Sequence, residues 1–411
     1  MNPIYNLIVY MVWFASSYYM IFLVLSMIVY KNELYRHENK SVDQNPFVSF
    51  IIPAYNEQED VLDTVESLKK VTYENIEFIF LNDGSSDNTA QIISKAIDNL
   101  PKFRLIDNKI NKGKAATLNQ GIEVAKGEFI ACMDADSVVE PSIVEKVLPF
   151  FDTKKVGAVT VSVEVNNPKT LLHKIISIEF SLGLSLLLRL FSFLDSVFVT
   201  PGPFSVYRSS VLKEIGGFDI NNVTEDHEIA FRIHKAGYKI TNCLHAKVYT
   251  TLPDTFKEIY VQRNRWYSGS ILTMIQHKKM LLNPKHGLFA FFIPFNMFLI
   301  VSSILLFTAT TYLSFSRLIR ELLYYRYTNF NFFNNWTFDY SLLYYGRINL
   351  LGITMSLFVV FFMFYGIYLV RKRYRDHKLG LFLFPFFFIL YQIFWYGAFY
   401  SVLKGGKIKW R

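Results

Sequence analysis

The sequence contains few cysteines and few charged side chains. Its 411 residues include two cysteines, Cys132 and Cys243, and charged residues make up 19%. Both cysteines fall in a segment that we expect to face the cytoplasm, which argues against a disulfide. The hydrophobic share of 52% and the aromatic share of 17% are too high for an ordinary soluble protein. The composition therefore predicts a membrane protein.

The first hydrophobic run lacks the basic start and the small-residue cleavage site of a signal peptide. It extends from Met1 to Tyr30, and about 20 apolar residues are enough to cross a bilayer as a helix. We therefore expect a retained transmembrane helix at residues 1–30. Three further candidate spans lie near the other end of the chain: roughly Gly287–Phe315, Asn349–Val370 and Gly380–Leu403.

These runs divide the chain into a transmembrane helix (1–30), a cytosolic domain (31–285) and C-terminal transmembrane helices with a short basic tail (286–411). Lys31, Arg36 and Lys40 follow the first helix, which places the amino terminus outside and the large domain in the cytoplasm. The basic stretch 371–375 and the tail after residue 403 should also lie inside. Three crossings after the domain would put the tail outside, so one segment is re-entrant or interfacial, or the number of crossings differs.

The net charge of +9 is modest for this length. Lysines facing anionic lipid explain it better than nucleic-acid binding does, so we expect a bilayer partner and no nucleic acid. Asn335-Trp336-Thr337 matches an N-glycosylation acceptor in a loop expected outside, but such triplets are common by chance.

Within 31–285, short apolar runs alternate with helical patterns. Val61, Leu62, Val65 and Leu68 share one helical face. Such alternation predicts a parallel sheet with helices on its faces, and ligands at the carboxyl ends of the strands. The glycine-rich dinucleotide fingerprint is absent after the first strand, which argues against a dehydrogenase. The expected strands are Phe47–Tyr55, Ile76–Asn82, Phe103–Asp107 and Glu128–Met133.

Polar residues follow three of these strands. They form the stretches Pro53-Ala54-Tyr55-Asn56-Glu57, Asn82-Asp83-Gly84-Ser85-Ser86-Asp87 and Asp134-Ala135-Asp136. Because alternate side chains of an extended strand point the same way, Asp134 and Asp136 can converge on one ligand. Mg²⁺ typically takes one or two carboxylates together with phosphate oxygens and water. An isolated pair of this kind would more often be two turn aspartates.

The run Leu171–Phe193 is apolar enough to be taken for another span. A crossing there would place Asp134 and Asp136 on the opposite side from the acidic residues that follow. Its polar residues recur every four positions, which predicts an amphipathic helix lying along the bilayer surface. They are His173, Ser177, Ser181, Ser185 and Arg189.

Two later motifs carry reactive side chains. Thr224-Glu225-Asp226 precedes a helical pattern. A carboxylate there can deprotonate a hydroxyl, which accelerates a reaction by about 10²–10⁴-fold. An ordinary helix cap is the alternative. Gln262, Arg265 and Trp266 fall on one helical face. Arginine can bind a diphosphate through two hydrogen bonds, and an indole can pack on a sugar ring; a core tryptophan beside a surface arginine is the alternative.

In this order, Asp134-Ala135-Asp136, Thr224-Glu225-Asp226 and Gln262-Arg263-Asn264-Arg265-Trp266 resemble the motifs of processive membrane family 2 glycosyltransferases. The chain is similar to poly-N-acetylglucosamine, hyaluronan and cellulose synthases. The resemblance implies an α/β GT-A (Rossmann-like) domain with interface helices. It also implies inverting, Mg²⁺- or Mn²⁺-dependent transfer from a UDP-sugar, such as UDP-N-acetylglucosamine, to a growing β-linked polysaccharide. Export would be coupled to synthesis, and accessory subunits are allowed.

The resemblance also assigns roles to residues. Asp226 would be the base, with Glu225 and Arg265 in the catalytic group, and the metal would contact Asp136 directly, with Asp134 nearer the ribose or the metal's water shell. Asn111-Lys112-Gly113-Lys114 resembles a basic turn near the nucleotide, although a solvated turn would look the same. Donor contacts would come from Pro53, Tyr55, Glu57, Asp83, Lys114, Asp134, Asp136, Gln262, Arg265 and Trp266.

Thr200-Pro201-Gly202-Pro203-Phe204-Ser205-Val206-Tyr207-Arg208 resembles the acceptor loop of hyaluronan synthases. It implies acceptor contacts from Gly202 and Tyr207, together with Trp266. Two alternatives stay open. One is a non-processive transferase that glycosylates a lipid or lipid-linked acceptor. The other is an inactive scaffold or channel of an export complex, against which the intact carboxylates at 134, 136 and 226 argue.

Overall fold

The computed structural model describes residues 3–35, 45–327, 347–370 and 378–405. The chain forms two compact units. The first contains Met1–Ser26 and Pro294–Tyr365, and the second contains Met27–Ile293 and Gly366–Arg411. Several positions with predicted roles lie outside the described residues: Arg36, Lys40, the triplet 335–337, the basic stretch 371–375 and the end of the basic tail, residues 406–411.

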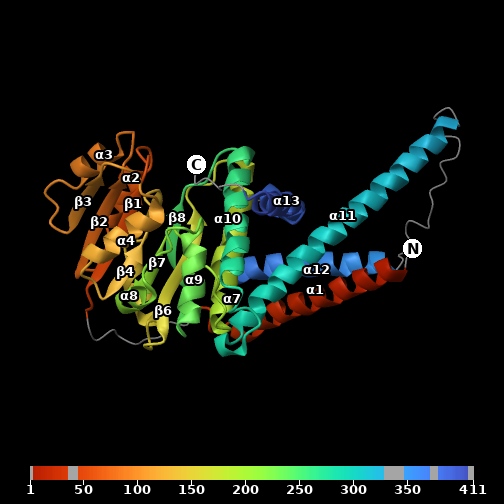
Figure 1. The fold of residues 1–411 in the computed structure, drawn as a ribbon, viewed down its shortest axis with the longest axis horizontal. Coiled ribbons are helices and arrows are strands. Elements are labelled where there is room, and N and C mark those ends of the chain that lie inside the picture. The colour runs from red at the N-terminus through yellow and green to blue at the C-terminus, as the bar shows by residue number, and fades with distance from the viewer. Residues whose placement is uncertain (1–2, 36–44, 328–346, 371–377, 406–411) are drawn as a thin grey trace. The chain divides into compact units, whose positions relative to one another are not determined.

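The second unit is built on one sheet of eight strands, in the order β3-β2-β1-β4-β7-β6-β8-β5 (Figure 1). The first four form its parallel half, and all four predicted strands are confirmed to within about two residues at each end. They are β1 (Val48–Ala54), β2 (Ile76–Asp83), β3 (Phe103–Asn108) and β4 (Phe129–Cys132).

The other half of the sheet is mixed. β7 pairs antiparallel with both β4 and β6, β6 and β8 are parallel, and β5 closes the edge antiparallel to β8. All ten residues of β6 are buried, so helices or loops cover both of its faces. The four strands are β5 (Ser137–Val139), β6 (Val156–Val165), β7 (Ser205–Arg208) and β8 (Lys239–Thr250).

Helices connect and cover these strands. In α2 (Val61–Leu68), Val61, Val65 and Leu68 are buried as predicted, but Leu62 is 47% exposed and lies off the apolar face. The other helices are α3 (Thr89–Ala96), α4 (Lys114–Val124), α5 (Ile143–Val147), η1 (Leu148–Phe150), α8 (Ser209–Ile215), α9 (Glu225–Lys235), α10 (Phe256–Gln276) and η3 (Pro284–His286).

The amphipathic helix predicted at Leu171–Phe193 has its polar stripe buried in the fold, whereas its position along the bilayer stays a prediction. The segment is helical, as α6 (Leu171–Phe180), η2 (Ser181–Leu187) and α7 (Leu188–Phe193), but its polar stripe is buried against the unit's own sheet. Ser185 donates to the carbonyl of Val163 in β6, and Arg189 donates to the carbonyls of Asn242 and Glu33. Buried polar groups need such partners, so carbonyl groups of the protein, and not water, satisfy this part of the stripe.

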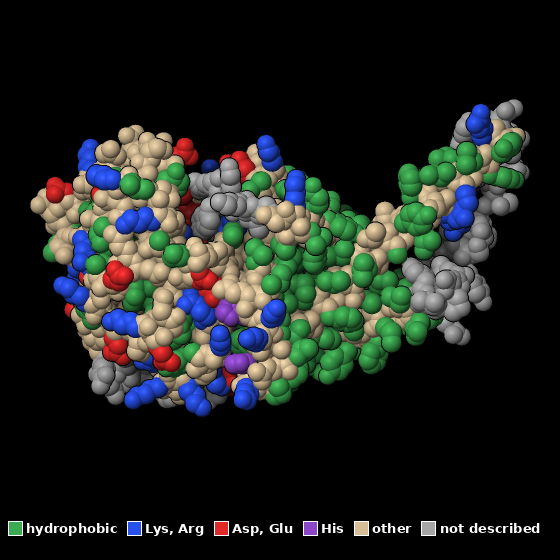
Figure 2. Space-filling model, viewed as in Figure 1, with side chains coloured by type: hydrophobic (Ala, Val, Ile, Leu, Met, Phe, Trp, Pro, Cys, Tyr) green, Lys and Arg blue, Asp and Glu red, His purple; other side chains and the backbone are tan. Residues whose placement is uncertain are grey.

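Four other long helices are apolar enough to cross a membrane, and they match the four predicted spans. By length and composition, α1, α11 and α12 each qualify alone; α13 qualifies only as two segments that meet at 46°. Figure 2 shows hydrophobic side chains over much of the surface of the long helices, and charged side chains over the unit that holds the sheet. The helices are α1 (Pro3–Tyr30), α11 (Phe289–Tyr327), α12 (Arg347–Val370) and α13 (Lys378–Leu403).

Helix α13 packs against α10 and α6 of the sheet-containing unit. The rings of Tyr267 and Trp395 stack 4.4 Å apart, and Asn264 donates to the hydroxyl of Ser401 at 3.1 Å. Gly397 allows the close approach, because a β-carbon there would lie 2.3 Å from the Tyr260 hydroxyl oxygen. α10 is therefore held between the sheet domain and an apolar helix.

Candidate active site

The turns that follow β1 and β2 are hydrogen-bonded to each other. Asn56, with a left-handed φ of 54°, donates its N–H to the Ser85 hydroxyl, and its side-chain oxygen accepts from the N–H of Ser86. The N–H of Glu57 donates to the Thr89 hydroxyl. Pro53 is half-buried in β1, and Tyr55 is 39% exposed in the turn. The predicted donor residues of the first strand thus lie at the carboxyl edge of the sheet.

Asp83 at the end of β2 holds the basic turn. Its two carboxylate oxygens accept from the backbone N–H groups of Lys112, at 2.8 Å, and Gly113, at 2.9 Å. Gly84 lets the turn come close, because it has a φ of 69° and a β-carbon there would lie 2.7 Å from the backbone nitrogen of Asn111. Asp83 therefore fixes the start of α4, where Lys114 is the first residue.

Lys114 joins two acidic motifs that are far apart in the sequence. Its ammonium nitrogen lies 2.6 Å from Asp134 Oδ1 and 2.8 Å from Glu225 Oε1. Burial would lower the pKa of Lys114, but the charges of Asp134, Glu225 and Asp226 outweigh burial and raise it. The lysine is therefore a cation at every physiological pH. The alternative of a solvated surface turn fails for this side chain, which is 15% exposed.

Asp134 and Asp136 follow β4, and Asp136 is affected both by burial and by the charge of Asp134. Burial, and then the charge of Asp134, raise the pKa of Asp136 to about 7, although the Ser137 hydroxyl donates to its carboxylate. A site that resists ionisation of a second carboxylate favours a cation. Among the described residues no group of three or more ligating side chains gathers. Two carboxylates completed by phosphate oxygens and water fit the usual requirements of Mg²⁺.

The loop that precedes β7 closes over these groups. A β-carbon on Gly202 would lie 2.8 Å from Lys114 Nζ and 2.9 Å from Asp134 Oδ2, so only glycine fits without displacing them. The Ser205 hydroxyl donates to the Pro201 carbonyl at 3.0 Å and stabilises the turn. Tyr207 is only 2% exposed, and its hydroxyl donates to Thr200 at 2.8 Å.

Asp226 is the second residue of α9 and is half-buried. Burial, and then the neighbouring charge of Glu225, raise its pKa to about 6, while the cations of Lys114 and Arg265 oppose the rise. A carboxylate with this pKa is ionised at neutral pH and is a stronger base than an ordinary aspartate. Thr224, at the N-cap, makes no side-chain capping bond; its N–H donates to the Asn222 side chain instead.

Helix α10 brings the last motif to this site. A β-carbon on Gly269 would lie 2.3 Å from the Thr224 hydroxyl oxygen, so α10 directly touches the start of α9. Arg265 lies one turn before Gly269, and its charge reaches Asp226. Gln262 and Trp266 are half-buried on the same helix. The three motifs therefore converge.

Arg263, the buried arginine of the last motif, had no predicted role. Its guanidinium lies 4.3 Å from the centroid of the Trp266 ring and pairs with Glu179 of α6 at 2.9 Å. One face of the indole is thus occupied by a cation. The letters of the motif do not distinguish the two arginines; only the packing of α6 against this part of the molecule does.

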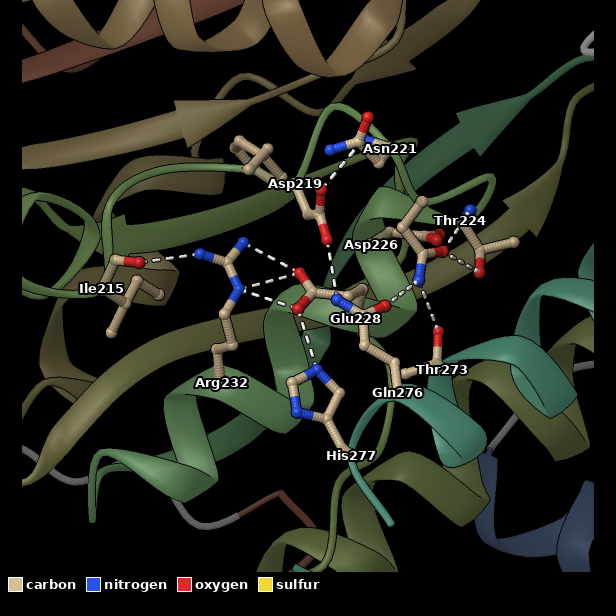
Figure 3. A network of polar contacts seen from close by, with 12 residues as sticks. Ile215, Asp219, Asn221, Thr224, Asp226, Glu228, Arg232, Thr273, Gln276 and His277 are labelled. Carbon is tan, nitrogen blue, oxygen red and sulfur yellow. Dashed lines mark hydrogen bonds and ion pairs between the residues drawn. The ribbon is translucent and has the colours of Figure 1, made fainter. Parts of the chain in front are cut away.

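A polar network behind Asp226 was also missed (Figure 3). Glu228, fully buried, accepts two hydrogen bonds from Arg232 Nε and lies 2.9 Å from His277 Nε2. Asn222 donates to Thr273 and Gln276, both on α10. The i, i+4 spacing of Glu228 and Arg232 was a visible signal of their pairing. The partners on α10, in contrast, depend on the fold. The network ties the helix that carries Asp226 to the helix that carries Arg265.

One pocket contains much of the predicted site. Of the predicted residues, Lys114, Asp134, Gly202, Tyr207, Glu225 and Asp226 line it. Asp136 and Arg265 act on these groups electrostatically, and Asp83 supports the turn from which Lys114 projects. Pro53, Tyr55, Glu57, Gln262 and Trp266 lie outside the pocket lining. Thr200, Ser205 and Phe218 line the pocket without having been assigned a role.

Comparisons with known proteins agree with this geometry. The family model described as glycosyl transferase family 2 matches residues 49–216. The poly-beta-1,6-N-acetyl-D-glucosamine synthase of Staphylococcus epidermidis is 30% identical over 352 residues, which are 84% of this chain and 82% of the relative. The enzyme of that name from Staphylococcus aureus (strain COL) is 33% identical over 230 residues, 56% of each chain.

A solved structure shares the fold. It is a mannosyltransferase from Pyrobaculum calidifontis in complex with GDP-Man and Mn²⁺, and it covers 96% of this chain and 100% of its own, with a TM-score of 0.59 and 16% identity.

Proposed function

This chain belongs to glycosyl transferase family 2, and on that premise we propose that it is a processive, inverting synthase. It transfers N-acetylglucosamine from UDP-N-acetylglucosamine to a growing β-linked polysaccharide. The catalytic unit has the GT-A fold, and several long apolar helices are candidate membrane spans. The donor and polymer are proposed from the names of relatives that align along most of the chain.

One observation carries the proposal: within one pocket, Lys114 joins Asp134, which follows β4, to Glu225 at the acidic start of α9. A transferase needs a site for the departing nucleotide and a base for the incoming hydroxyl, and here the candidates for both are adjacent. Neither a scaffold nor a channel requires a base whose pKa lies near 6.

The proposed chemistry assigns one task to each group. Asp226 accepts the proton of the acceptor hydroxyl as that oxygen bonds to the anomeric carbon, while the bond from this carbon to the diphosphate breaks on the opposite face. Arg265 and Lys114 supply positive charge near the departing UDP. Asp134 and Asp136 would hold Mg²⁺ or Mn²⁺, which supplies further charge to the diphosphate when bound.

We also propose where the acceptor lies and which side the domain faces. Gly202, Tyr207 and Trp266 border the acceptor, and Pro53, Tyr55, Glu57, Asp83 and Gln262 complete the donor site. The catalytic unit faces the cytoplasm, and the product leaves through the membrane region. Lys31 directly after α1 supports this orientation.

The test uses the purified full-length protein with UDP-N-acetylglucosamine and Mg²⁺ or Mn²⁺. UDP release and the size of the product are measured, with Asp226→Asn as the matched inactive control. Long polymer supports the proposal. A lipid that carries a single sugar would instead indicate a non-processive transferase. If the protein shows no UDP release and no sugar transfer with any donor, it is a scaffold.

A further inference from the structure

Thr200 holds the backbone of Asp226 through two hydrogen bonds. Its N–H donates to the Asp226 carbonyl oxygen at 3.0 Å, and its hydroxyl donates to the same oxygen at 2.9 Å. Asp226 stands in the first turn of α9, whose backbone N–H groups have no partners within the helix, so the backbone there is held less firmly than in the helix interior. Thr200 therefore supports the residue from outside the helix.

A third residue, Tyr207, fixes the direction of the hydrogen bond that the Thr200 hydroxyl makes. The Tyr207 hydroxyl donates to Thr200 Oγ1 at 2.8 Å. A threonine hydroxyl has one proton, so with Tyr207 donating to its oxygen, that proton is directed to Asp226. Thr200 and Tyr207 are 1% and 2% exposed, respectively, and water therefore cannot readily replace either partner.

The same loop also touches the donor side of the pocket. Two residues after Thr200, Gly202 lies against Lys114 and Asp134. The turn that contains Gly202 is stabilised by two hydrogen bonds, which the Phe204 N–H and the Ser205 hydroxyl donate to the Pro201 carbonyl. Thr200 thus sets the position of Asp226 relative to the carboxylate on the other side of the pocket.

We propose that Thr200, oriented by Tyr207, is a positioning residue that holds the base Asp226 in register with the donor site. This inference rests on the proposed function, because it assigns a task to a residue that acts through the proposed base. A small displacement of a base lowers the rate of proton transfer without altering donor binding to the same degree.

Thr200→Val keeps the shape and the backbone N–H but removes the hydroxyl. We expect kcat to fall about tenfold or more, with the KM for the donor changed less than about twofold and UDP binding retained. Thr200→Ser keeps the hydroxyl and should restore most of kcat. Ser162→Ala is the matched control, since Ser162 is equally buried, lies outside the pocket lining and donates to the Leu244 carbonyl at 2.7 Å. It should lose stability with kcat unchanged.

Thr200→Val leaves the Tyr207 hydroxyl buried without an acceptor, and this alone could destabilise the fold. The double variant Thr200→Val/Tyr207→Phe removes both polar groups and should recover thermal stability while remaining slow. Recovery of kcat along with stability, or equal loss in Thr200→Ser and Thr200→Val, would overturn the positioning role. Wild-type turnover and its loss in Asp226→Asn are measured in parallel, so failure of the proposed function shows in those two proteins alone.

Discussion

Thr224 at the start of α9 packs directly against Gly269 of α10. A β-carbon on Gly269 would lie 2.3 Å from Thr224 Oγ1 and 2.4 Å from its Cγ2. This contact sets the separation between the helix that carries Asp226 and the helix that carries Arg265. A side chain as short as threonine cannot move aside without moving the backbone.

Gly269→Ala is therefore expected to push the two helices apart and to lower kcat by about tenfold or more. Intrinsic helix propensity alone would favour alanine by about 1 kcal/mol, so a loss must come from the contact. Adding Thr224→Ala removes the two nearest atoms and should restore part of the activity. Gly183→Ala, where a β-carbon meets nothing within 4 Å, is the control and should leave kcat unchanged.

Asp226→Asn should abolish turnover and leave UDP binding nearly intact, whereas Asp136→Ala should weaken metal-dependent UDP binding. The raised pKa of Asp226 means that the folded state disfavours its charge. The free energy of unfolding is therefore lowered once the pH exceeds the ordinary pKa of aspartate, and it falls further as the pH rises toward 6. Asp226→Asn removes that penalty and should stabilise the protein at pH 7 by on the order of 1 to 3 kcal/mol. Thermal unfolding and titration with UDP measure both effects, and full turnover in Asp226→Asn would exclude Asp226 as the base.

Measured at saturating metal and donor, the pH dependence of kcat should show the ionisation of Asp226 near pH 6. Asp226 works as a base only in its carboxylate form, and its pKa is about 6. The rate should therefore be level above pH 7 and fall about tenfold for each unit below 6. A rate that stays constant down to pH 5 would contradict the assignment.

Lys114→Met should move this ionisation upward. The lysine lowers the pKa of Asp226, and its removal leaves Glu225 without the cation 2.8 Å away. We expect a lower kcat at pH 7, a shift of the pH profile to higher pH and a less stable protein, because a buried carboxylate becomes unpaired. Lys155→Met removes an exposed lysine that lies outside the pocket lining, and it serves as the charge-matched control. An unshifted profile would show that Lys114 does not act on the base.

Helix α13 is expected to remain on the cytoplasmic side. A β-carbon on Gly380 near its start would lie 3.5 Å from Lys174 Cβ of α6, and Ser401 near its end contacts Asn264 of α10. The two ends of a helix that crosses the bilayer lie on opposite faces, about 30 Å apart. Both ends of α13, however, touch the catalytic unit. The bend of 46° is compatible with a re-entrant path.

Reporter fusions after residues 375 and 411 test this topology. Both should report the cytoplasmic side, in agreement with the basic residues at each position. Reporters on opposite sides of the membrane would show that α13 crosses.

The parallel half of the sheet was predictable from sequence because its strands are short apolar runs with polar residues at their ends. Asp134, Asp136, Asp226 and Arg265 could be selected for the same reason: the chemistry requires these side-chain types in a recognisable local order. Length and hydropathy identified the four candidate membrane helices, but Leu171–Phe193 passes the same test, and only its burial in the fold distinguishes it.

Other features depend on residues that meet from distant parts of the chain. The period-four polar stripe of 171–193 indicated an amphipathic helix, but not whether water or strand carbonyls would satisfy it. The support of Asp226 by Thr200, the pairing of Lys114 with Glu225, and the choice of Arg263 for burial arise from packing. Periodicity specifies which side chains share a face; the free energy of burying polar groups, summed over the whole fold, specifies what that face touches.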